Sequence, residues 1–234
     1  KIYKNSNFHI VNPSKWLAEK VGQSVLKDKP LSVIYNGIDT SIFKPSRSDL
    51  ARLRSDLKLP QDKHIILIVA KRGQTNPWKG GNYAQEAIKA LKSRSDVFFI
   101  DLGGDTSQSA GNTKLVNFIK DEALLAKYYS AADILLYPSI ADNCPLVVLE
   151  AMACGLPIVA FETGGIPELV EHKINGYIAK YKDSEDLKTG LEYLLNLSSE
   201  ETEKMKQYSI NKIQNGFTVQ KMANQYLELY KNLI

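Results

Sequence analysis

The chain has 234 residues, of which 44% are hydrophobic and 24% are charged, and its formal net charge is +4. This length and balance predict one globular domain with a sizeable core. We find no transmembrane run, no signal peptide and no internal repeat, so neither a membrane-spanning nor a repeat architecture is predicted. The mild positive charge is compatible with phosphate ligands or with an anionic membrane surface.

The first continuous apolar run covers residues 64–70 and predicts a strand that is covered on both faces. A loop over residues 71–81 follows it, with three cations and two glycines at its end. A helix is expected to begin near Asn82, with Tyr83 or Ala84, Ala87, Ile88 and Leu91 on one face.

The cations of this loop are well placed for a diphosphate, because they follow the carboxyl end of a strand. Arg72 offers a planar fork and Lys79 offers a point charge. A solvated basic loop explains the same residues about as well. Trp78 is expected to be a packing residue rather than a platform for a nucleobase.

The middle of the chain continues the alternation of strands and helices. Residues 97–102 predict a strand, and Gly103 and Gly104 predict a tight turn after it, because no G-x-G-x-x-G fingerprint follows. Leu124, Leu125 and Tyr128 mark a helix. It leads to an apolar run over residues 133–139, which predicts a short strand that stops at Pro138.

Glu150 is the only charge between Pro145 and Cys154, in a run that looks buried all round. Pro145 suits the first turn of a helix, Gly155 suits its C-cap, and residues 156–161 suit a buried strand. A carboxylate is almost never fully buried without a partner, so Glu150 is either paired inside the protein or faces a cleft where a ligand is the partner.

Asp142 lies eight residues before Glu150, in the loop between the strand and the helix. In open parallel sheets, ligands bind at the carboxyl ends of strands, beside helix N-termini that attract anions. Asp142 is expected at that edge. The alternative is that Asp142 caps the helix and Glu150 meets an internal cation.

The last part of the chain predicts three more helices. One has an apolar face of leucines, the next begins with a capping box at Ser198 and Glu201, and the last is capped by Thr218. Glu168 is expected to have a structural role in the first turn of a short helix. The leucines are Leu187, Leu191, Leu194 and Leu195.

The two cysteines, Cys144 and Cys154, lie on or beside one helix, too far apart along it for a disulfide. No metal-ligand companions accompany them, so a reducing cytoplasm is the simplest context. His9, His64 and His172 are scattered and are expected to be structural.

These motifs carry a resemblance to a known family. Asp142 to Glu150 resembles the Glu-x7-Glu motif of retaining glycosyltransferases of the GT-B fold, most closely family 4 of the glycosyltransferases. Arg72 and the pair Lys79-Gly80 resemble the phosphate-binding residues of this family. Further matching segments follow the same order along the chain: residues 14–17, 36–40, 43–45, 151–160 and 164–168.

The resemblance implies a fold and a set of roles. The fold is α/β, a Rossmann-like parallel sheet with helices on both faces, which is one half of a GT-B glycosyltransferase. Glu150 would bind the ribose hydroxyls of a nucleotide-sugar, Asp142 the donor hexose, and Arg72 with Lys79 the diphosphate. The remaining donor-binding residues implied by the resemblance are Asn143, Cys144, Leu146, Gly80, Ile119, Gly164 and Gly165.

Two positions depart from the family pattern. Asp142 is one methylene shorter than the usual Glu, and Pro145 stands where the family often has Gly, which removes one backbone donor. Both departures bear on the sugar that is bound.

The resemblance also divides the chain. Residues 1–44 would be the end of a first domain and an interdomain segment, residues 45–216 the nucleotide-sugar-binding domain, and residues 217–234 a C-terminal helix. The chain begins with Lys and looks like the C-terminal half of a longer enzyme, which alone is expected to be inactive.

The implied function is transfer of a hexosyl group, with retention, from a nucleoside-diphosphate sugar to a glycan or lipid-linked acceptor in bacterial surface polysaccharide or lipopolysaccharide synthesis. The acceptor would be held through the missing N-terminal domain. No metal, other cofactor or nucleic-acid partner is expected. The expected location is the cytoplasm, and peripheral association with the inner face of the cytoplasmic membrane is left open.

Two rival functions come from other classes. A noncatalytic nucleotide-sugar-binding module would keep Arg72, Lys79 and Glu150, and turnover by the intact protein would exclude it. A dinucleotide oxidoreductase would need a glycine-rich fingerprint after its first strand, where this chain has Lys71-Arg-Gly-Gln-Thr75.

Overall fold

The computed structural model describes residues 2–46, 49–70, 77–104 and 107–233. Lys71 and Arg72 therefore lie outside the described residues. The helices are α1 (Ile2–Asn5), α2 (Lys15–Gly22), α3 (Leu50–Asp56), α4 (Gly81–Leu91), α5 (Glu122–Ala131), α6 (Leu146–Ala153), α7 (Ile166–Leu169), α8 (Ser184–Leu195), α9 (Ser199–Gly216) and α10 (Val219–Leu233), with a short 3-10 helix at Pro77–Lys79. The strands are β1 (Ile10–Asn12), β2 (Leu31–Val33), β3 (His64–Val69), β4 (Val97–Gly104), β5 (Gln108–Ala110), β6 (Thr113–Asn117), β7 (Ile134–Tyr137), β8 (Ile158–Phe161) and β9 (Gly176–Ala179).

The main sheet has seven strands in the order β5-β6-β4-β3-β7-β8-β9. All neighbours pair in parallel except the edge strand β5, which runs antiparallel to β6. Without β5, this is the strand order of a Rossmann sheet, and the order reverses between β3 and β7. The predicted α/β Rossmann-like fold is confirmed, with one antiparallel edge strand added.

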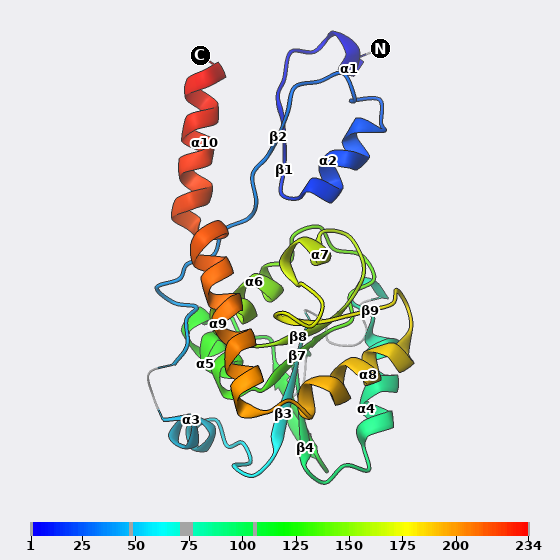
Figure 1. Cartoon of the computed structure of the whole chain (residues 1–234), viewed down its shortest axis with the longest axis vertical. Coiled ribbons are helices and arrows are strands. Elements are labelled where there is room, and N and C mark those ends of the chain that lie inside the picture. The colour runs from blue at the N-terminus through cyan, green and yellow to red at the C-terminus, as the bar shows by residue number, and fades with distance from the viewer. Residues whose placement is uncertain (1, 47–48, 71–76, 105–106, 234) are drawn as a thin grey trace.

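The central strands are buried on both faces, because β-branched and leucine side chains fill nearly every position. β7 and β8 are buried at every residue. One core layer joins the sheet to α3, α5, α6 and α9, and the other joins it to α4 and α8. Figure 1 shows these two sets of helices on opposite sides of the sheet. The sequence prediction of helices on both faces is confirmed.

Two local predictions need correction. Gly103 and Gly104 do not form a tight turn: β4 continues through both, and Gly104 pairs with Asn117 after a shift in register. The pairing partner β6 runs alongside, so its backbone groups keep the strand extended beyond the apolar run. Pro145 is the N-cap of α6 rather than a residue of its first turn, because its ψ of 121° is extended.

Helix ends follow the predicted chemistry. Gly155 has a φ of 78° and ends α6, with the N–H groups of Gly155 and Leu156 bonded to the carbonyls of Met152 and Ala151. Ser198 and Glu201 form the expected capping box of α9. The Thr218 hydroxyl accepts a hydrogen bond from the N–H of Lys221, in the first turn of α10.

A smaller unit precedes the main sheet. β1 and β2 pair in parallel, and α2 packs beside them. Figure 1 shows this unit above the main sheet, with α10 rising next to it. Ile38 pairs with Thr218 in an isolated bridge, which joins the segment after β2 to the start of α10. Among the described residues, no helix combines the length and apolar character needed to cross a bilayer.

Candidate functional site

The candidate site lies where the strand order reverses. β3 leads into the loop that ends at the 3-10 helix and α4, and β7 leads into residues 138–145 before α6. Since β3 and β7 are parallel neighbours, their carboxyl ends meet at one edge of the sheet. Loops from neighbouring strands diverge at such a reversal and leave a crevice for a ligand.

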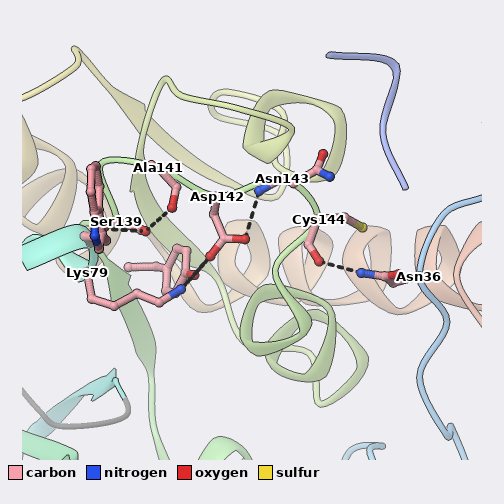
Figure 2. Close-up of polar contacts among 9 residues, drawn as sticks. Asn36, Lys79, Ser139, Ala141, Asp142, Asn143 and Cys144 are labelled. Carbon is pink, nitrogen blue, oxygen red and sulfur yellow. Dashed lines mark hydrogen bonds and ion pairs between the residues drawn. The ribbon is translucent and has the colours of Figure 1, made fainter. Parts of the chain in front are cut away.

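Lys79 and Asp142 meet at this point. The Lys79 Nζ lies 2.5 Å from Asp142 Oδ2, and Figure 2 shows the two side chains pointing toward each other. A third residue joins them: the Tyr137 hydroxyl donates to Asp142 Oδ2 at 2.5 Å and accepts from Lys79 Nζ at 2.9 Å. Both charged side chains remain partly exposed, so a ligand has access to them.

Gly80 lets the two loops approach each other. Its φ is 67°, and a Cβ atom at this position would lie 1.8 Å from the backbone oxygen of Pro138. Such a contact excludes any side chain. Gly80 therefore brings Lys79 against the end of β7. A direct donor contact by Gly80 remains a prediction.

Hydrogen bonds between side chains and backbone groups hold the loop that carries Asp142 (Figure 2). The Ser139 hydroxyl donates to the carbonyls of Trp78 and Ala141, and the N–H of Asn143 donates to Asp142 Oδ1 at 2.9 Å. The backbone N–H of Asn143, one of the residues that the resemblance implies bind the donor sugar nucleotide, is thus already bonded inside the chain. To bind a phosphate, this N–H would have to exchange its bond to Asp142 for one to the ligand.

Cys144 and Leu146 lie on either side of the N-cap of α6. The Cys144 carbonyl accepts from the Asn36 side chain at 3.0 Å, and Leu146 begins the helix with an exposed side chain. The first N–H groups of a helix have no partner within it, so this end of α6 suits an anion. Their contact with a donor phosphate remains a prediction.

Glu150 has a neutral internal partner. The hydroxyl of Tyr129, on α5, donates to Glu150 Oε2 at 2.9 Å, and among the described residues no Lys or Arg forms an ion pair with this carboxylate. The structure gives Glu150 a phenol as its internal partner in place of the expected cation, and a contact with a ligand remains a prediction. Burial raises the pKa of Glu150, the bond from Tyr129 lowers it, and the charge of Glu122 raises it further.

Gly164 and Gly165 pack against the loop that carries Asp142. Gly164 has a φ of 58°, and a Cβ there would lie 1.7 Å from the Asp142 carbonyl oxygen. A Cβ on Gly165 would lie 1.9 Å from the Asn143 carbonyl oxygen. Both glycines therefore have a packing role in the structure, and their approach to donor phosphates remains a prediction.

Glu168 has the structural role that the sequence suggested, with a different partner. It lies in the first turn of α7, but its carboxylate accepts from the N–H groups of Lys15 and Trp16 at 2.9 and 2.8 Å and from the Tyr35 hydroxyl at 2.7 Å. It caps α2, a helix that begins 153 residues earlier in the chain. Ser14, the N-cap of α2, also bonds the side chain of Asn143.

Other predicted residues lie away from these contacts. Ile119 follows β6 and packs its side chain on the core, and the donor contact that the resemblance implies for it remains a prediction. Trp78 is 64% exposed, so the expectation that it is a packing residue is wrong. The backbone carbonyl of Trp78 accepts a hydrogen bond from Ser139, while the Trp78 side chain faces outward. Cys144 and Cys154 are both free and buried, and burial raises their pKa values to about 11 and about 12.

The sequence analysis missed Tyr129 and Tyr137. A tyrosine at the end of a buried strand or helix needs a partner for its hydroxyl, and this signal was present in both segments. The identity of the partner depends on how α5, β7 and α6 pack, which a local pattern does not contain.

The chain is similar to known glycosyltransferases. A family model described as glycosyl transferases group 1 matches residues 51–212. AmsK, an amylovoran biosynthesis glycosyltransferase of Erwinia amylovora, is 32% identical over 189 residues, which cover 73% of this chain and 46% of that protein. The chain spans half or less of the length of the curated relatives it matches, 39% of one and 50% of another.

Solved structures show the same fold. A glycosyltransferase from Rickettsia africae superposes with a TM-score of 0.84 at 20% identity, covering 99% of this chain and 66% of that one. Anabaena Alr3699/HepE in complex with UDP-glucose superposes with a TM-score of 0.78 at 24% identity, covering 96% of this chain and 64% of that one. With its Rossmann-like sheet, and with a family model matched over most of its length, this chain belongs to the group 1 family of glycosyltransferases.

Proposed function

We propose that this chain is the donor-binding part of a retaining hexosyltransferase that uses a nucleoside-diphosphate sugar. The observation that carries the proposal is the meeting of Lys79, Asp142 and Tyr137 at the point where the strand order reverses. A cation there suits a diphosphate, and a fixed carboxylate beside it suits sugar hydroxyls.

Each group has a role in this proposal. Glu150, an acceptor on a rigid helix, holds the ribose hydroxyls, and Asp142 holds the hexose. Lys79, together with Arg72 from the sequence motif, binds the diphosphate and stabilises the negative charge that develops on it as the glycosidic bond breaks. The nucleoside diphosphate leaves from the face on which the acceptor attacks, and no protein nucleophile is used.

The finer features of the proposal follow from the sequence resemblance and from the relatives. These features are membership of family 4, retention, and a glycan or lipid-linked acceptor held by an N-terminal domain. AmsK is named for amylovoran biosynthesis, which supports a surface polysaccharide or lipopolysaccharide pathway. HepE was solved with UDP-glucose, which supports a nucleotide-sugar donor. The domain bounds at residues 44 and 216, a cytoplasmic location and peripheral membrane association belong to the same proposal.

Calorimetric titration of the chain with uridine and guanosine nucleotides and their hexose esters tests donor binding. Lys79→Ala should weaken binding of the diphosphates with a far smaller effect on the free nucleosides, since Lys79 contacts phosphate. Lys204→Ala removes an equal charge from an exposed ion pair on α9 and is the control. Loss of nucleoside and diphosphate binding by the same factor in Lys79→Ala would contradict the role given to this residue.

Transfer needs the longer protein, because the acceptor is positioned from the other side of the cleft. We expect the chain alone to bind the donor and transfer nothing, while the full-length protein transfers the sugar with its anomeric configuration retained. Anomeric NMR of the product checks retention. A full-length protein that binds the donor and never turns over would favour the noncatalytic binding module instead.

A further inference from the structure

Two buried tyrosines donate hydrogen bonds to the two carboxylates of the site. Tyr129 on α5 is 0% exposed and donates to Glu150 Oε2 at 2.9 Å. Tyr137, the last residue of β7, is 2% exposed and donates to Asp142 Oδ2 at 2.5 Å. The same chemical pairing therefore occurs twice, from two different elements of the fold.

The core holds both rings in place. Tyr129 packs edge-on against Phe43 with 6.2 Å between ring centroids, and the strand neighbours of Tyr137 are buried at every position. A buried phenol has two side-chain torsions and loses little further freedom when its hydroxyl bonds an acceptor. Glu150 and Asp142 are each more exposed than the tyrosine that bonds them, so the phenols fix the carboxylates rather than the reverse.

The hydroxyl protons stay on the tyrosines. Burial, followed by the charge of Glu150, raises the pKa of Tyr129 well above its usual value. Burial and the charge of Asp142 raise the pKa of Tyr137 in the same way, and the charge of Glu150 adds to this. Both phenols are therefore donors at neutral pH.

The Tyr129 bond leaves one oxygen of Glu150 for a ligand, whereas both oxygens of Asp142 have internal partners. Tyr129 occupies Oε2 of Glu150, and among the described residues no donor lies within hydrogen-bond distance of Oε1. At Asp142, Oδ2 receives both Tyr137 and Lys79, while Oδ1 accepts from the Asn143 N–H. Tyr137 also accepts from Lys79, so it sets the position of the cation as well as that of the anion.

We propose that Tyr129 and Tyr137 are positioning residues, with Tyr129 orienting Glu150 toward the ribose and Tyr137 orienting Asp142 and Lys79 toward the hexose and diphosphate. This inference rests on the proposed function. It adds two residues that the sequence motif does not contain, and it divides their effects between the two parts of the donor.

The substitutions Tyr129→Phe and Tyr137→Phe remove only the hydroxyls and test this division. The probes are uridine, UDP and UDP-glucose, together with guanosine, GDP and GDP-mannose. In whichever of the two series binds, Tyr129→Phe should weaken the binding of all three ligands by a similar factor, about tenfold, because each ligand contains the ribose. Tyr137→Phe should leave nucleoside affinity within about twofold and weaken the diphosphate and the sugar ester about five- to tenfold.

Tyr177→Phe is the matched control. Its hydroxyl donates to Asp186 at 2.8 Å in another, partly buried tyrosine–carboxylate pair, formed between β9 and α8. It should lower the melting temperature by an amount comparable to the other two variants and change no affinity. Affinities are expressed per folded protein from thermal melts, so a merely structural role of Tyr129 or Tyr137 would give this same result.

A pH profile separates positioning from stability. The Tyr129 bond lowers the pKa of Glu150, so Tyr129→Phe should move the acid limb of nucleoside binding to higher pH. If neither Tyr→Phe variant changes affinity, or if both weaken all three ligands equally, the inference is overturned while the proposed function stands. Failure of the unmodified chain to bind any of the six probes would overturn the proposed function, and the inference with it.

Discussion

Lys79 and Asp142 form an ion pair across the reversal point of the sheet, with 2.5 Å between Nζ and Oδ2, although 63 residues separate them in the chain. Without a ligand, the carboxylate takes the place beside the cation that the proposed function gives to a diphosphate. Donor binding must then share or exchange this pair.

Asp142→Asn should therefore strengthen the binding of a nucleoside diphosphate that lacks a sugar. The gain should be about two- to fivefold, because a partly exposed ion pair is worth up to ~1 kcal/mol. The same variant should bind the sugar ester no better than the diphosphate, since its contact with the hexose is lost. Calorimetry with UDP and UDP-glucose, or with GDP and GDP-mannose, measures both values.

Asp62→Asn is the control for this change in net charge, because Asp62 is exposed and lies just before β3, at the opposite edge of the sheet. It should leave both affinities unchanged. Equal or weaker diphosphate binding by Asp142→Asn would mean that Asp142 does not compete with the diphosphate for Lys79.

Nucleoside affinity should fall at acid pH with the titration of Glu150. Burial raises the pKa of this group above its ordinary value of 4.5, so protonation begins at a higher pH than for an exposed Glu. The protonated form accepts ribose hydroxyls less well. Affinity is therefore full above the raised pKa and is lost as the pH falls through it.

Glu150→Gln should remove this pH dependence and weaken nucleoside binding at neutral pH by roughly 1.5–3 kcal/mol. Its stability should change little, because the internal partner is a neutral phenol and no buried charge is left unpaired. Because its pKa is raised, the contribution of Glu150 to the free energy of unfolding is full below pH 4.5 and is lost as the pH rises through the raised value, so the variant should lose this contribution to the pH dependence. Normal nucleoside binding with a much lower melting temperature would show that Glu150 is structural.

Donor binding should survive the removal of divalent metal. The proposed site supplies positive charge to the diphosphate through Lys79, and through Arg72 in the sequence motif. Titration of UDP-glucose or GDP-mannose with and without EDTA checks this expectation. Complete loss of binding that manganese or magnesium restores would contradict it.

Gly164→Ala should destabilise the chain by about 2–4 kcal/mol and weaken donor binding. The new Cβ would meet the Asp142 carbonyl oxygen at 1.7 Å, and a φ of 58° is strained for any residue with a side chain. Gly216→Ala, where no atom lies within 4 Å, is the control and should cost little. Denaturant unfolding of both variants measures the difference, and equal stability of the two would contradict the close approach of these loops.

Glu168→Gln should loosen α2 without unfolding the main sheet. A neutral amide replaces the carboxylate that accepts the N–H groups of Lys15 and Trp16, at a cost of about 1–2 kcal/mol in local stability. Hydrogen exchange at these two amides reports the change. Glu19→Gln, on the exposed side of the same helix, is the control, and equal exchange in both variants would show that Glu168 is not the cap.

The sequence by itself determined four strands of the main sheet, β3, β4, β7 and β8, together with most helices and the edge of the sheet that carries the site. Continuous apolar runs fixed β3, β7 and β8, and caps such as Ser198 with Glu201 fixed helix ends. These features depend on neighbours a few residues away, so a local pattern contains them. Gly103 and Gly104 are the exception: the pairing of β4 with β6, which is not local, overrode their tendency to turn.

The tertiary structure decided which side chains meet. The partner of Glu150 is Tyr129, 21 residues away, and Glu168 caps a helix that begins 153 residues earlier. Lys79, Tyr137 and Asp142 come together because β3 and β7 are neighbours in the sheet and Gly80 lets their loops touch. Strand order and packing set these distances, and no spacing along the chain encodes them. The sequence motif therefore determined the chemical groups of the site, while the fold determined the buried phenols that hold them.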